Sequence, residues 1–458
     1  MIKINEPRAS ARMLSLAERT GRHSGSVKGI GMQLWLIPTL YAIVSVAAGF
    51  LVPRLEATFL AVSLNLSTSS AQAYLSAVAS GMMALTGIVF SIAFVLVQFN
   101  AVVYSPRLVV WFARDRLLFH SLGMFVATFM YSLSTLAWVD RQGAQGVPFL
   151  SAAIVAAMLV ASVLMLAQLV QRLNNLQIIR VLQALGDTGR QVIVSTYQAV
   201  PWRTSGKAAR AKDLQGTPEL TVKHVGNPQS VTSIDIARLV HHARRMDGLI
   251  VMECGVGDTL LEDSVILRAH GTAALVRDKE LSACVRLDEQ RTFELDPKYA
   301  MRLLVDVAIK ALSPAINDPT TAVQAIDQIE DMLRRLAKCD LEACRAFDDD
   351  GDLRVIYRMP TWEDYLALAF DEIRQFGSTS IQVMRRLRAA LVELVACVDG
   401  ERAKLVRGYL IHLDSGIERS GFDPQDRAAA RIEDRQGLGL SHHQGGGAAP
   451  EEVERAVS

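Results

Sequence analysis

Four long apolar runs in the first third of the chain constrain its fold more than any other feature. They are Met32–Pro53, Ala77–Phe99, Leu117–Val139 and Pro148–Gln171, and none contains Asp, Glu, Lys or Arg. A helix that crosses a bilayer needs about 20 predominantly apolar residues, whereas the helices of a soluble core alternate polar and apolar faces. The runs therefore predict a transmembrane domain of four helices at residues 32–171.

Basic residues mark one side of this predicted bundle. The tail at residues 1–31 carries six Lys or Arg against two Glu, and the second connecting segment carries Arg107, Arg114 and Arg116. The positive-inside rule assigns such segments to the cytoplasm. With four spans, both termini are then expected in the cytoplasm, and the lipid bilayer is the first expected partner.

The polar remainder of the chain predicts a cytoplasmic α+β domain. Residues 172–190 continue the helical period of the fourth run and predict a stalk helix that stops at Gly186. Residues 191–290 predict a β-rich subdomain, because short β-like runs alternate there with turn residues. The expected strands are 191–194, 219–224, 249–254 and 264–268, with one helix over 233–245.

Residues 291–433 predict a helical subdomain. Asp296-Pro297 and Asp318-Pro319 each place a capping acid before a proline at the first helical position, and Thr361 is expected to cap a later helix. The expected helices are 297–312, 319–337, one that begins after Thr361, 378–397 and 400–413, with a strand at 353–358.

Two segments near the C-terminus are expected at the surface. Arg385, Arg386 and Arg388 are interpreted as a stripe that faces solvent or lipid headgroups. Residues 434–458 are rich in glycine and polar side chains with little to bury, which predicts a disordered tail.

Composition narrows the function classes. The formal net charge of +1 gives no case for nucleic acid as a partner. The five cysteines all fall in the predicted cytoplasmic region, where free thiols are expected. No zinc-ligand spacing and no site for a covalent cofactor is recognisable. The sequence thus predicts no cofactor, no metal and no catalytic residues.

Two motifs carry a resemblance to a known family. The first is Gly87-Ile-Val-Phe-Ser-Ile-Ala-Phe-Val-Leu-Val-Gln98, followed by Ser105-Pro106-Arg107. The second joins Arg291-Thr292 and Asp296-Pro297 to Ala311-Leu-Ser-Pro-Ala-Ile-Asn-Asp-Pro-Thr-Thr-Ala322. Over residues 34–413 the chain resembles the bacterial predicted membrane proteins called domain of unknown function 2254. The resemblance implies a multi-pass protein of the bacterial inner membrane with a cytoplasmic C-terminal domain, and it brings no established reaction or ligand.

The chain departs from that family's pattern at two places. Asn174 and Asn175 stand where the family tends to show histidine, so a metal role is not expected there. A turn usually written with proline reads Val256-Gly257-Asp258, and the retained glycine is expected to preserve the fold. The surrounding stretch 254–266 predicts a structural hairpin.

The second motif also supplies the predicted ligand site. Pro314 ends one helix and Asp318 begins the next, which leaves a tight polar corner between them. The corner is interpreted as an anion site at a helix N-terminus, as a hard-cation site, or as a rigid connector whose polar groups satisfy its own backbone. The candidate ligand or ion residues are Ser313, Asn317, Asp318, Thr320, Thr321 and Asp306.

Small and hydroxyl residues in the apolar runs either line a narrow passage or let helices pack closely, within one chain or between subunits. The leading hypothesis is an oligomeric ion-permeation pore with a cytoplasmic regulatory domain, which makes a homo-oligomer the expected assembly. The pore-lining candidates are Thr86, Ser91, Thr128, Ser132 and Ser134.

The alternative hypothesis is a membrane-anchored sensor or scaffold without transport activity. In that case the spans only hold and oligomerise the C-terminal domain, and the corner at residues 313–321 binds a small ligand or ion. An enzyme is not predicted, because no arrangement of a nucleophile with a base is recognisable in the sequence.

Overall fold

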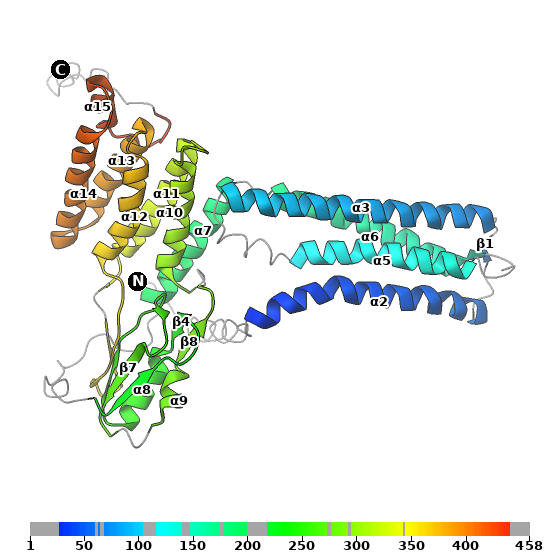
Figure 1. Ribbon diagram of the computed structural model, residues 1–458, viewed down its shortest axis with the longest axis horizontal. Helices are drawn as coiled ribbons and strands as arrows, with labels where there is room; N and C mark the ends of the chain where they lie inside the picture. The colour runs from blue at the N-terminus through cyan, green and yellow to red at the C-terminus, as the bar shows by residue number, and fades with distance from the viewer. Residues whose placement is uncertain are drawn as a thin grey trace, which may run out of the picture. The chain divides into compact units, whose positions relative to one another are not determined.

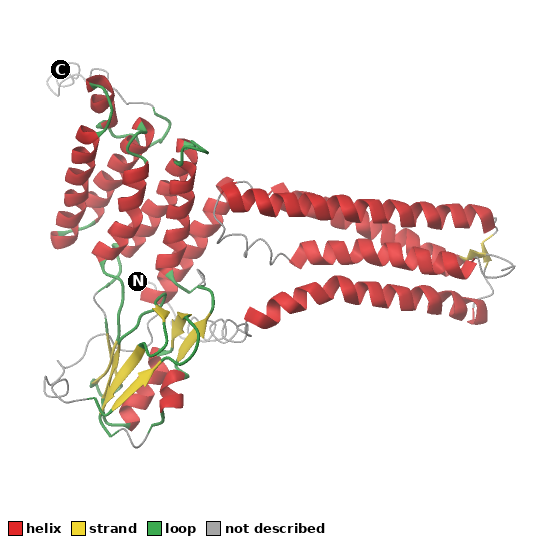
Figure 2. Cartoon of the chain, in the orientation of Figure 1, coloured by secondary structure: helices red, strands yellow, loops and turns green. Residues whose placement is uncertain are grey.

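The chain divides into two compact units. The membrane unit comprises residues 1–102 and 106–177, and the C-terminal unit comprises residues 103–105 and 178–458. Figure 2 shows that the membrane unit is almost entirely helical, whereas the C-terminal unit combines helices and strands. The computed structural model describes residues 27–59, 63–64, 68–103, 116–139, 147–174, 178–198, 218–272, 276–291, 295–341 and 344–439.

Four long helices that run alongside one another form the membrane unit (Figure 1). They are α2 (Val27–Phe59), α3 (Thr68–Val103), α5 (Arg116–Val139) and α6 (Phe149–Asn174). Each contains a segment long and apolar enough to cross a membrane. The short strands β1 (Ser63–Leu64) and β2 (Val147–Pro148) pair antiparallel at one end of the bundle. The predicted order of four spans followed by an α+β domain is confirmed.

The helices extend beyond the apolar runs, because α2 continues to Phe59 and α3 begins at Thr68. Glu56 lies inside α2, only 3% exposed. The Glu56 carboxylate accepts hydrogen bonds from the backbone N–H groups of Leu150, at 2.7 Å, and Ser151, at 3.2 Å. These groups belong to the first turn of α6, whose N–H groups have no partner within the helix. Glu56 therefore stays buried because it caps a neighbouring helix.

Helices α2 and α5 approach each other closely at glycine positions. A Cβ atom on Gly49 would lie 2.6 Å from Cβ of Ser134, and one on Gly123 would lie 3.0 Å from the ring of Tyr41. A larger residue at Gly49 would force the two backbones apart. Small residues here join helices of the same chain.

The C-terminal unit begins with α7 (Ile178–Ile193), which continues into one turn of π-helix, η1 (Val194–Gln198). Short helices α8 (Ile236–Arg245) and α9 (Asp278–Ser282) accompany the strands. The other helices are α10 (Pro297–Ala311), α11 (Pro319–Leu336), α12 (Trp362–Phe376), α13 (Ile381–Cys397), α14 (Gly400–Arg419) and α15 (Pro424–Ala430).

Two sheets form the β part of this unit. The five-stranded sheet has the order β3-β7-β5-β10-β9, and the three-stranded sheet has the order β6-β4-β8. Strands β9 and β10 come from the predicted helical region, yet β10 pairs parallel with β5 and completes the larger sheet. The strands are β3 (Leu220–Lys223), β4 (Gln229–Ile234), β5 (Leu249–Met252), β6 (Thr259–Leu260), β7 (Val265–His270), β8 (Val285–Asp288), β9 (Arg345–Phe347) and β10 (Leu353–Ile356).

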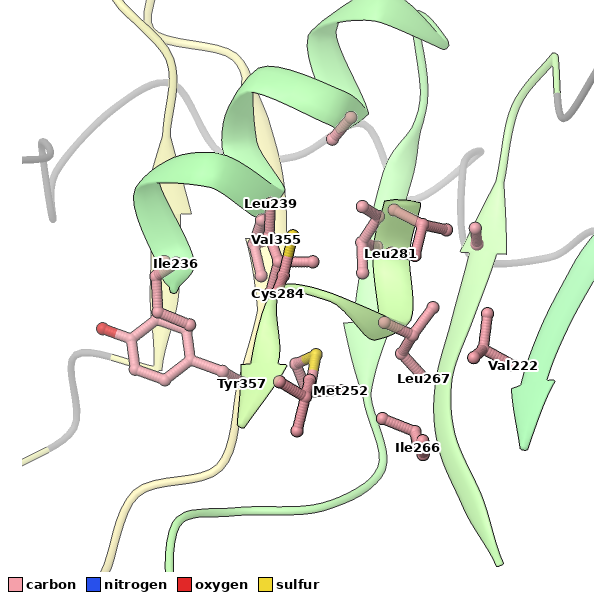
Figure 3. Packing of buried hydrophobic residues seen from close by; sticks show 14 of the residues in the cluster. Val222, Ile236, Leu239, Met252, Ile266, Leu267, Leu281, Cys284, Val355 and Tyr357 are labelled. Atoms are coloured by element: carbon pink, nitrogen blue, oxygen red, sulfur yellow. The ribbon is translucent and has the colours of Figure 1, made fainter. Parts of the chain in front are cut away.

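A hydrophobic core holds the strands and α8 together. Figure 3 shows Leu239 of α8 beside Val355 of β10, with Met252 and Leu267 below them. These four side chains are 0–1% exposed. Burying one such side chain contributes about 1.5–3 kcal/mol to the stability of the fold. This cluster therefore stabilises the β part, from which the surrounding loops extend.

Most predicted element boundaries in this unit are confirmed. Helices α10 and α11 begin at the two Asp-Pro pairs, and each aspartate side chain accepts a hydrogen bond from the first helical turn. Thr361 caps α12 and forms a reciprocal capping box with Asp364. Helix α8 is an exception. It begins at Ile236 with Asp235 as its cap, because Ser233 is used in strand β4.

The predicted stop at Gly186 and the predicted strand at 191–194 are wrong. Helix α7 runs through both positions and packs against α10 and α11. A Cβ atom on Gly186 would lie 2.2 Å from Oε1 of Gln328, so the glycine permits close packing on α11 and does not end the helix. Residues 175–177, where the predicted stalk would continue α6, lie outside the described residues.

The arginine stripe and the start of the disordered tail are also corrected. Arg385 and Arg386 are 5% and 6% exposed, so they do not face solvent or lipid. Arg388 pairs with Asp414. Residues 434–439 fold back on α13, where the Gly439 carbonyl accepts a hydrogen bond from Arg385 at 2.7 Å. The remainder of the predicted tail, 440–458, lies outside the described residues.

Candidate functional site

The predicted ligand corner forms the connection between α10 and α11. Ser313 donates its hydroxyl to the Lys310 carbonyl at 2.7 Å. Asn317 has φ +49°, a left-handed conformation that asparagine tolerates better than most residues. Asp318 accepts hydrogen bonds from the Thr321 backbone at 3.1 Å and from the Thr321 hydroxyl at 2.6 Å. These contacts account for the polar groups of Ser313 and Asp318 within the corner itself.

Two of the predicted ligand residues, Asp306 and Thr320, do not take part in the hydrogen bonds of the corner described above. The Asp306 carboxylate accepts a hydrogen bond from Nε of Arg302, at 2.6 Å, and Arg302 also binds Glu372 through both terminal nitrogens. Thr320 is exposed. Among the described residues, no group of three or more His, Cys, Asp or Glu is arranged to hold a metal ion.

The five pore-lining candidates occupy two helices. Thr128, Ser132 and Ser134 of α5 are buried in the bundle, and the Thr128 hydroxyl lies 3.0 Å from that of Ser162 on α6. Thr86 of α3 donates to its own helix, at the Met82 carbonyl. Ser91, also on α3, is exposed. The Thr128 hydroxyl therefore connects α5 to α6 within the chain.

A cavity of about 720 Å³ lies elsewhere in the C-terminal unit, between its β part and its helices. Its wall combines η1, the turn at residues 255–258, the start of α10 and the segment 357–368. A volume of this size is within the usual range for a small-molecule site, roughly 300–1,000 Å³. We take this cavity as the candidate functional site.

The turn at residues 255–258 is shaped by contacts on both sides. The Gly255 N–H donates to Oδ2 of Asp258 at 2.8 Å, and Gly257 has φ +91°. A Cβ atom on Gly257 would lie 2.6 Å from Oδ2 of Asp296. The turn thus needs glycine for its backbone conformation and for its close approach to α10. It leads into β6, which pairs with β4, so the expected simple hairpin over 254–266 is wrong.

Asp296 and Lys298 connect α10 to this turn. The Asp296 carboxylate is 4% exposed and accepts a hydrogen bond from the Lys298 backbone at 2.9 Å. The Lys298 ammonium donates to the Val256 carbonyl at 2.8 Å. Burial raises the pKa of Asp296 above its ordinary value, although the charge of Lys298 and the backbone N–H groups act in the opposite direction. A carboxyl group is therefore held in the cavity wall against a desolvation cost.

Two tyrosines form a second polar contact in the wall. The hydroxyls of Tyr197, from η1, and Tyr365, from α12, lie 2.8 Å apart. Burial raises the pKa of both phenols, and the nearby Asp296 charge adds to this effect. Both tyrosines are therefore protonated and neutral at physiological pH. One of the two hydroxyls donates its proton to the other in this contact. The other hydroxyl proton is available to a second acceptor.

The sequence contained residues of this cavity that were not connected to a ligand site by sequence alone. Arg291 and Asp296 belong to the second family motif, and Gly257 was recognised as a retained turn residue. The structure places all three in one cavity wall. Sequence alone could not join them, because the turn and α10 are separated by about forty residues and meet only through the fold. Tyr197 lies three residues after the expected strand 191–194, and no feature of the sequence singled it out.

Comparisons with known proteins identify the family. The model of a family described as predicted membrane proteins, domain of unknown function 2254, matches residues 32–393. The chain belongs to this family. Uncharacterized proteins of Mycobacterium tuberculosis and Mycobacterium bovis are 26% identical to it over 411 residues, which is 86% of this chain and 78% of theirs. No solved structure matches the chain. The family match covers all four predicted spans and the whole cavity wall described above.

Proposed function

We propose that this protein is a sensor of the bacterial inner membrane, whose C-terminal unit lies in the cytoplasm and binds a small ligand in the 720 Å³ cavity. The cytoplasmic orientation is supported by the basic N-terminal tail and the basic second connecting segment. Binding needs no cofactor and no catalytic step. This function corresponds to the sensor alternative, with the ligand in the cavity and not at the corner.

The position of η1 in the cavity wall carries the proposal. Ser195, Thr196 and Tyr197 line the cavity, and they directly follow α7 in the chain. Only residues 175–177 separate α7 from α6, the last membrane helix. A ligand that contacts η1 therefore acts on the turn that ends α7, the first helix after the last membrane helix in the chain. Single turns of π-helix often occur at functional sites, which fits a segment that responds to a ligand.

A ligand screen on the full-length protein in lipid nanodiscs tests this function. Thermal unfolding is followed with a library of neutral, cationic and anionic metabolites, because a ligand that binds only the folded state raises the melting temperature. Ser195→Trp places an indole in the cavity, and Thr379→Trp adds the same side chain at an exposed turn outside the wall.

At least one compound is expected to stabilise the wild type and Thr379→Trp and to leave Ser195→Trp unchanged. A library without any stabilising compound would contradict the proposed function. Stabilisation that survives in Ser195→Trp but is lost when Asn317 and Asp318 are both changed to alanine would move the site to the corner at residues 313–321.

An oligomeric pore is the second candidate, and the exposed face of α3 favours it. Ala77, Gly81, Ala84, Gly87 and Ser91 are all exposed on this helix. A Cβ atom on Gly81 or Gly87 would meet no other atom within 4 Å. Small residues exposed in this way suit close packing against a helix of a second subunit.

Conductance in planar bilayers tests the pore. The wild type is expected to conduct, and Gly87→Leu is expected to abolish conductance by disrupting subunit packing. Bilayers that stay silent over a range of ions and voltages would contradict this candidate and leave the sensor function unaffected.

A further inference from the structure

Some charged side chains of the cavity wall are engaged by hydrogen bonds or ion pairs within the protein, and others can contact a ligand. Asp258 accepts the Gly255 N–H, and Asp364 accepts the Thr361 N–H and hydroxyl in the capping box. Both acids therefore satisfy backbone groups of their own turns. Arg302 is committed as well, because Glu372 and Asp306 occupy its guanidinium.

Asp296 is likewise committed to the start of α10. Its carboxylate is the N-cap of that helix and accepts the Lys298 backbone N–H. Its second oxygen faces the backbone of Gly257. The three acids of the wall thus accept hydrogen bonds from nearby groups. These bonds reduce the repulsion that their charges would exert on an anion in the cavity.

Two side-chain cations, those of Arg291 and Lys298, interact with the buried Asp296 carboxylate only through their charges, which lower its pKa. Within the residues that the structure describes, neither Arg291 nor Lys298 forms an ion pair within 4 Å. The Lys298 ammonium donates a hydrogen bond to a neutral carbonyl, that of Val256, at 2.8 Å. Arg358 holds Glu253 by a single long contact of 3.4 Å, and its side chain is 68% exposed. The wall therefore carries an excess of available positive charge.

The rest of the wall suits an apolar or aromatic body. Tyr299 and Tyr357 join the Tyr197–Tyr365 pair in lining the cavity. Leu295 also lines it, and its side chain is 49% exposed and so accessible to a ligand. Aromatic rings and an exposed leucine next to unpaired cations form the combination that binds a ring with an acidic substituent.

We infer that the ligand of this cavity is a small organic anion, with a carboxylate or phosphate bound by Arg291 and Lys298 and a ring packed among the tyrosines. This inference rests on the proposed function and specifies its ligand. The cavity volume of about 720 Å³ accommodates a molecule of the size of a mononucleotide.

Matched pairs of compounds test the charge requirement. Thermal shift and calorimetry on the full-length protein in phosphatidylcholine nanodiscs compare AMP with adenosine, benzoate with benzamide, and indole-3-acetate with indole-3-acetamide. At least one anion is expected to bind, and its neutral partner is expected to bind much more weakly. Inorganic phosphate alone is expected to bind more weakly than the organic anion, because it lacks the ring.

Substitutions of Arg291 and Lys298 test whether these two cations bind the anion. Arg291→Gln and Lys298→Gln are each expected to weaken binding of that anion about ten-fold or more, since each removes a charge-assisted contact. Lys298→Arg restores the charge and is expected to recover part of the affinity, which separates loss of charge from loss of fold. Arg345→Gln, on the exposed edge strand β9, is the control and is expected to bind as the wild type does.

The outcomes separate this inference from the proposed function. Equal binding of charged and neutral partners, with loss of binding in Ser195→Trp, would overturn the anion class and keep the cavity as a ligand site. Unchanged anion binding in both Arg291→Gln and Lys298→Gln would also overturn it. If no compound of either class binds, the proposed function fails together with the inference.

Discussion

Gly257 is the residue on which the cavity wall depends most directly. Its φ of +91° is costly for any other residue, and a Cβ atom would meet the Asp296 carboxylate at 2.6 Å. We expect Gly257→Ala to reduce the free energy of unfolding by roughly 1–3 kcal/mol and to weaken ligand binding. Thermal unfolding and calorimetry measure the two effects.

Gly408→Ala is the matched control for this substitution. Gly408 lies inside α14, and no atom lies within 4 Å of its added Cβ. Alanine is the better helix former by about 0.5–1 kcal/mol, so this variant should gain stability. Gly257→Ala with the stability of the wild type would show that the turn is not held as described.

Asp296 makes a pH-dependent contribution to stability. Because its pKa is raised in the folded protein, the folded state binds the proton more tightly than the unfolded chain does. Its contribution to stability is therefore largest at acid pH, and it falls as the pH rises from the ordinary value of 3.8 through the raised pKa. Asp296→Asn keeps a capping side chain and removes the titration.

We expect the stability of the wild type relative to Asp296→Asn to fall as the pH rises above 3.8 and then to stay constant. Thermal unfolding of both proteins across this range measures the difference. A relative stability that rises with pH would mean that Lys298 and the backbone N–H groups outweigh burial.

The cysteines should differ widely in reactivity. Burial raises the pKa of Cys254 and of Cys284 to about 11, so both are almost fully protonated at neutral pH. Cys397 is exposed. Maleimide labelling followed by mass spectrometry is expected to modify Cys397 well before Cys254 and Cys284, and rapid labelling of either buried thiol would contradict the described packing.

At the scale of elements, an ion-pair network joins α11 to α13. Arg386 contacts Asp327 at 2.7 Å and Glu330 at 2.6 Å, and the side chains of Arg386 and Glu330 are 8% and 7% exposed. Removing Arg386 breaks both contacts and leaves the buried Glu330 with Arg334 as its remaining cationic partner. We expect Arg386→Gln to cost roughly 3–5 kcal/mol of unfolding free energy.

Arg335→Gln provides the comparison for Arg386→Gln. Arg335 pairs with Asp331 on the outer face of α11, where both side chains are more than 40% exposed. Its loss should cost only about 0–1 kcal/mol. Equal losses in chemical unfolding of the two variants would contradict the difference in burial.

Elements with strong end signals were predictable from sequence, and those held by distant contacts were not. The Asp-Pro pairs at residues 296 and 318 defined α10 and α11, because a capping acid before proline is a local signal. The extent of α7 depends on Gly186 packing against Gln328 on α11. The burial of Arg386 depends on the same helix. Neither contact has a local trace in the sequence.

The burial of a charged residue in the membrane unit also depends on a contact that is distant in the sequence. Glu56 looked like a loop residue because it lies beyond the first apolar run. Its burial follows from a cap on α6, almost a hundred residues later in the chain. The candidate site residues show the same difference between local signals and distant contacts. The corner at 313–321 was predicted from its unusual motif, whereas the cavity forms only where four segments distant in the sequence meet.

In the whole molecule, one stretch of chain leads from the last of the four candidate spans to the cavity for which we propose a ligand. The stretch passes from α6 through α7 to η1, and η1 ends in the cavity wall. A ligand in the cavity is therefore expected to order η1 and, through it, the segment that follows the last membrane helix. A scaffold that only anchors a domain would need no such arrangement.

Hydrogen–deuterium exchange of the full-length protein in nanodiscs, with and without a bound organic anion, tests this central claim most directly. We expect slower exchange at residues 195–197, 255–258 and 295–299, which line the cavity. Slower exchange that is confined to residues 313–321 or to the membrane unit, with these three segments unchanged, would contradict it.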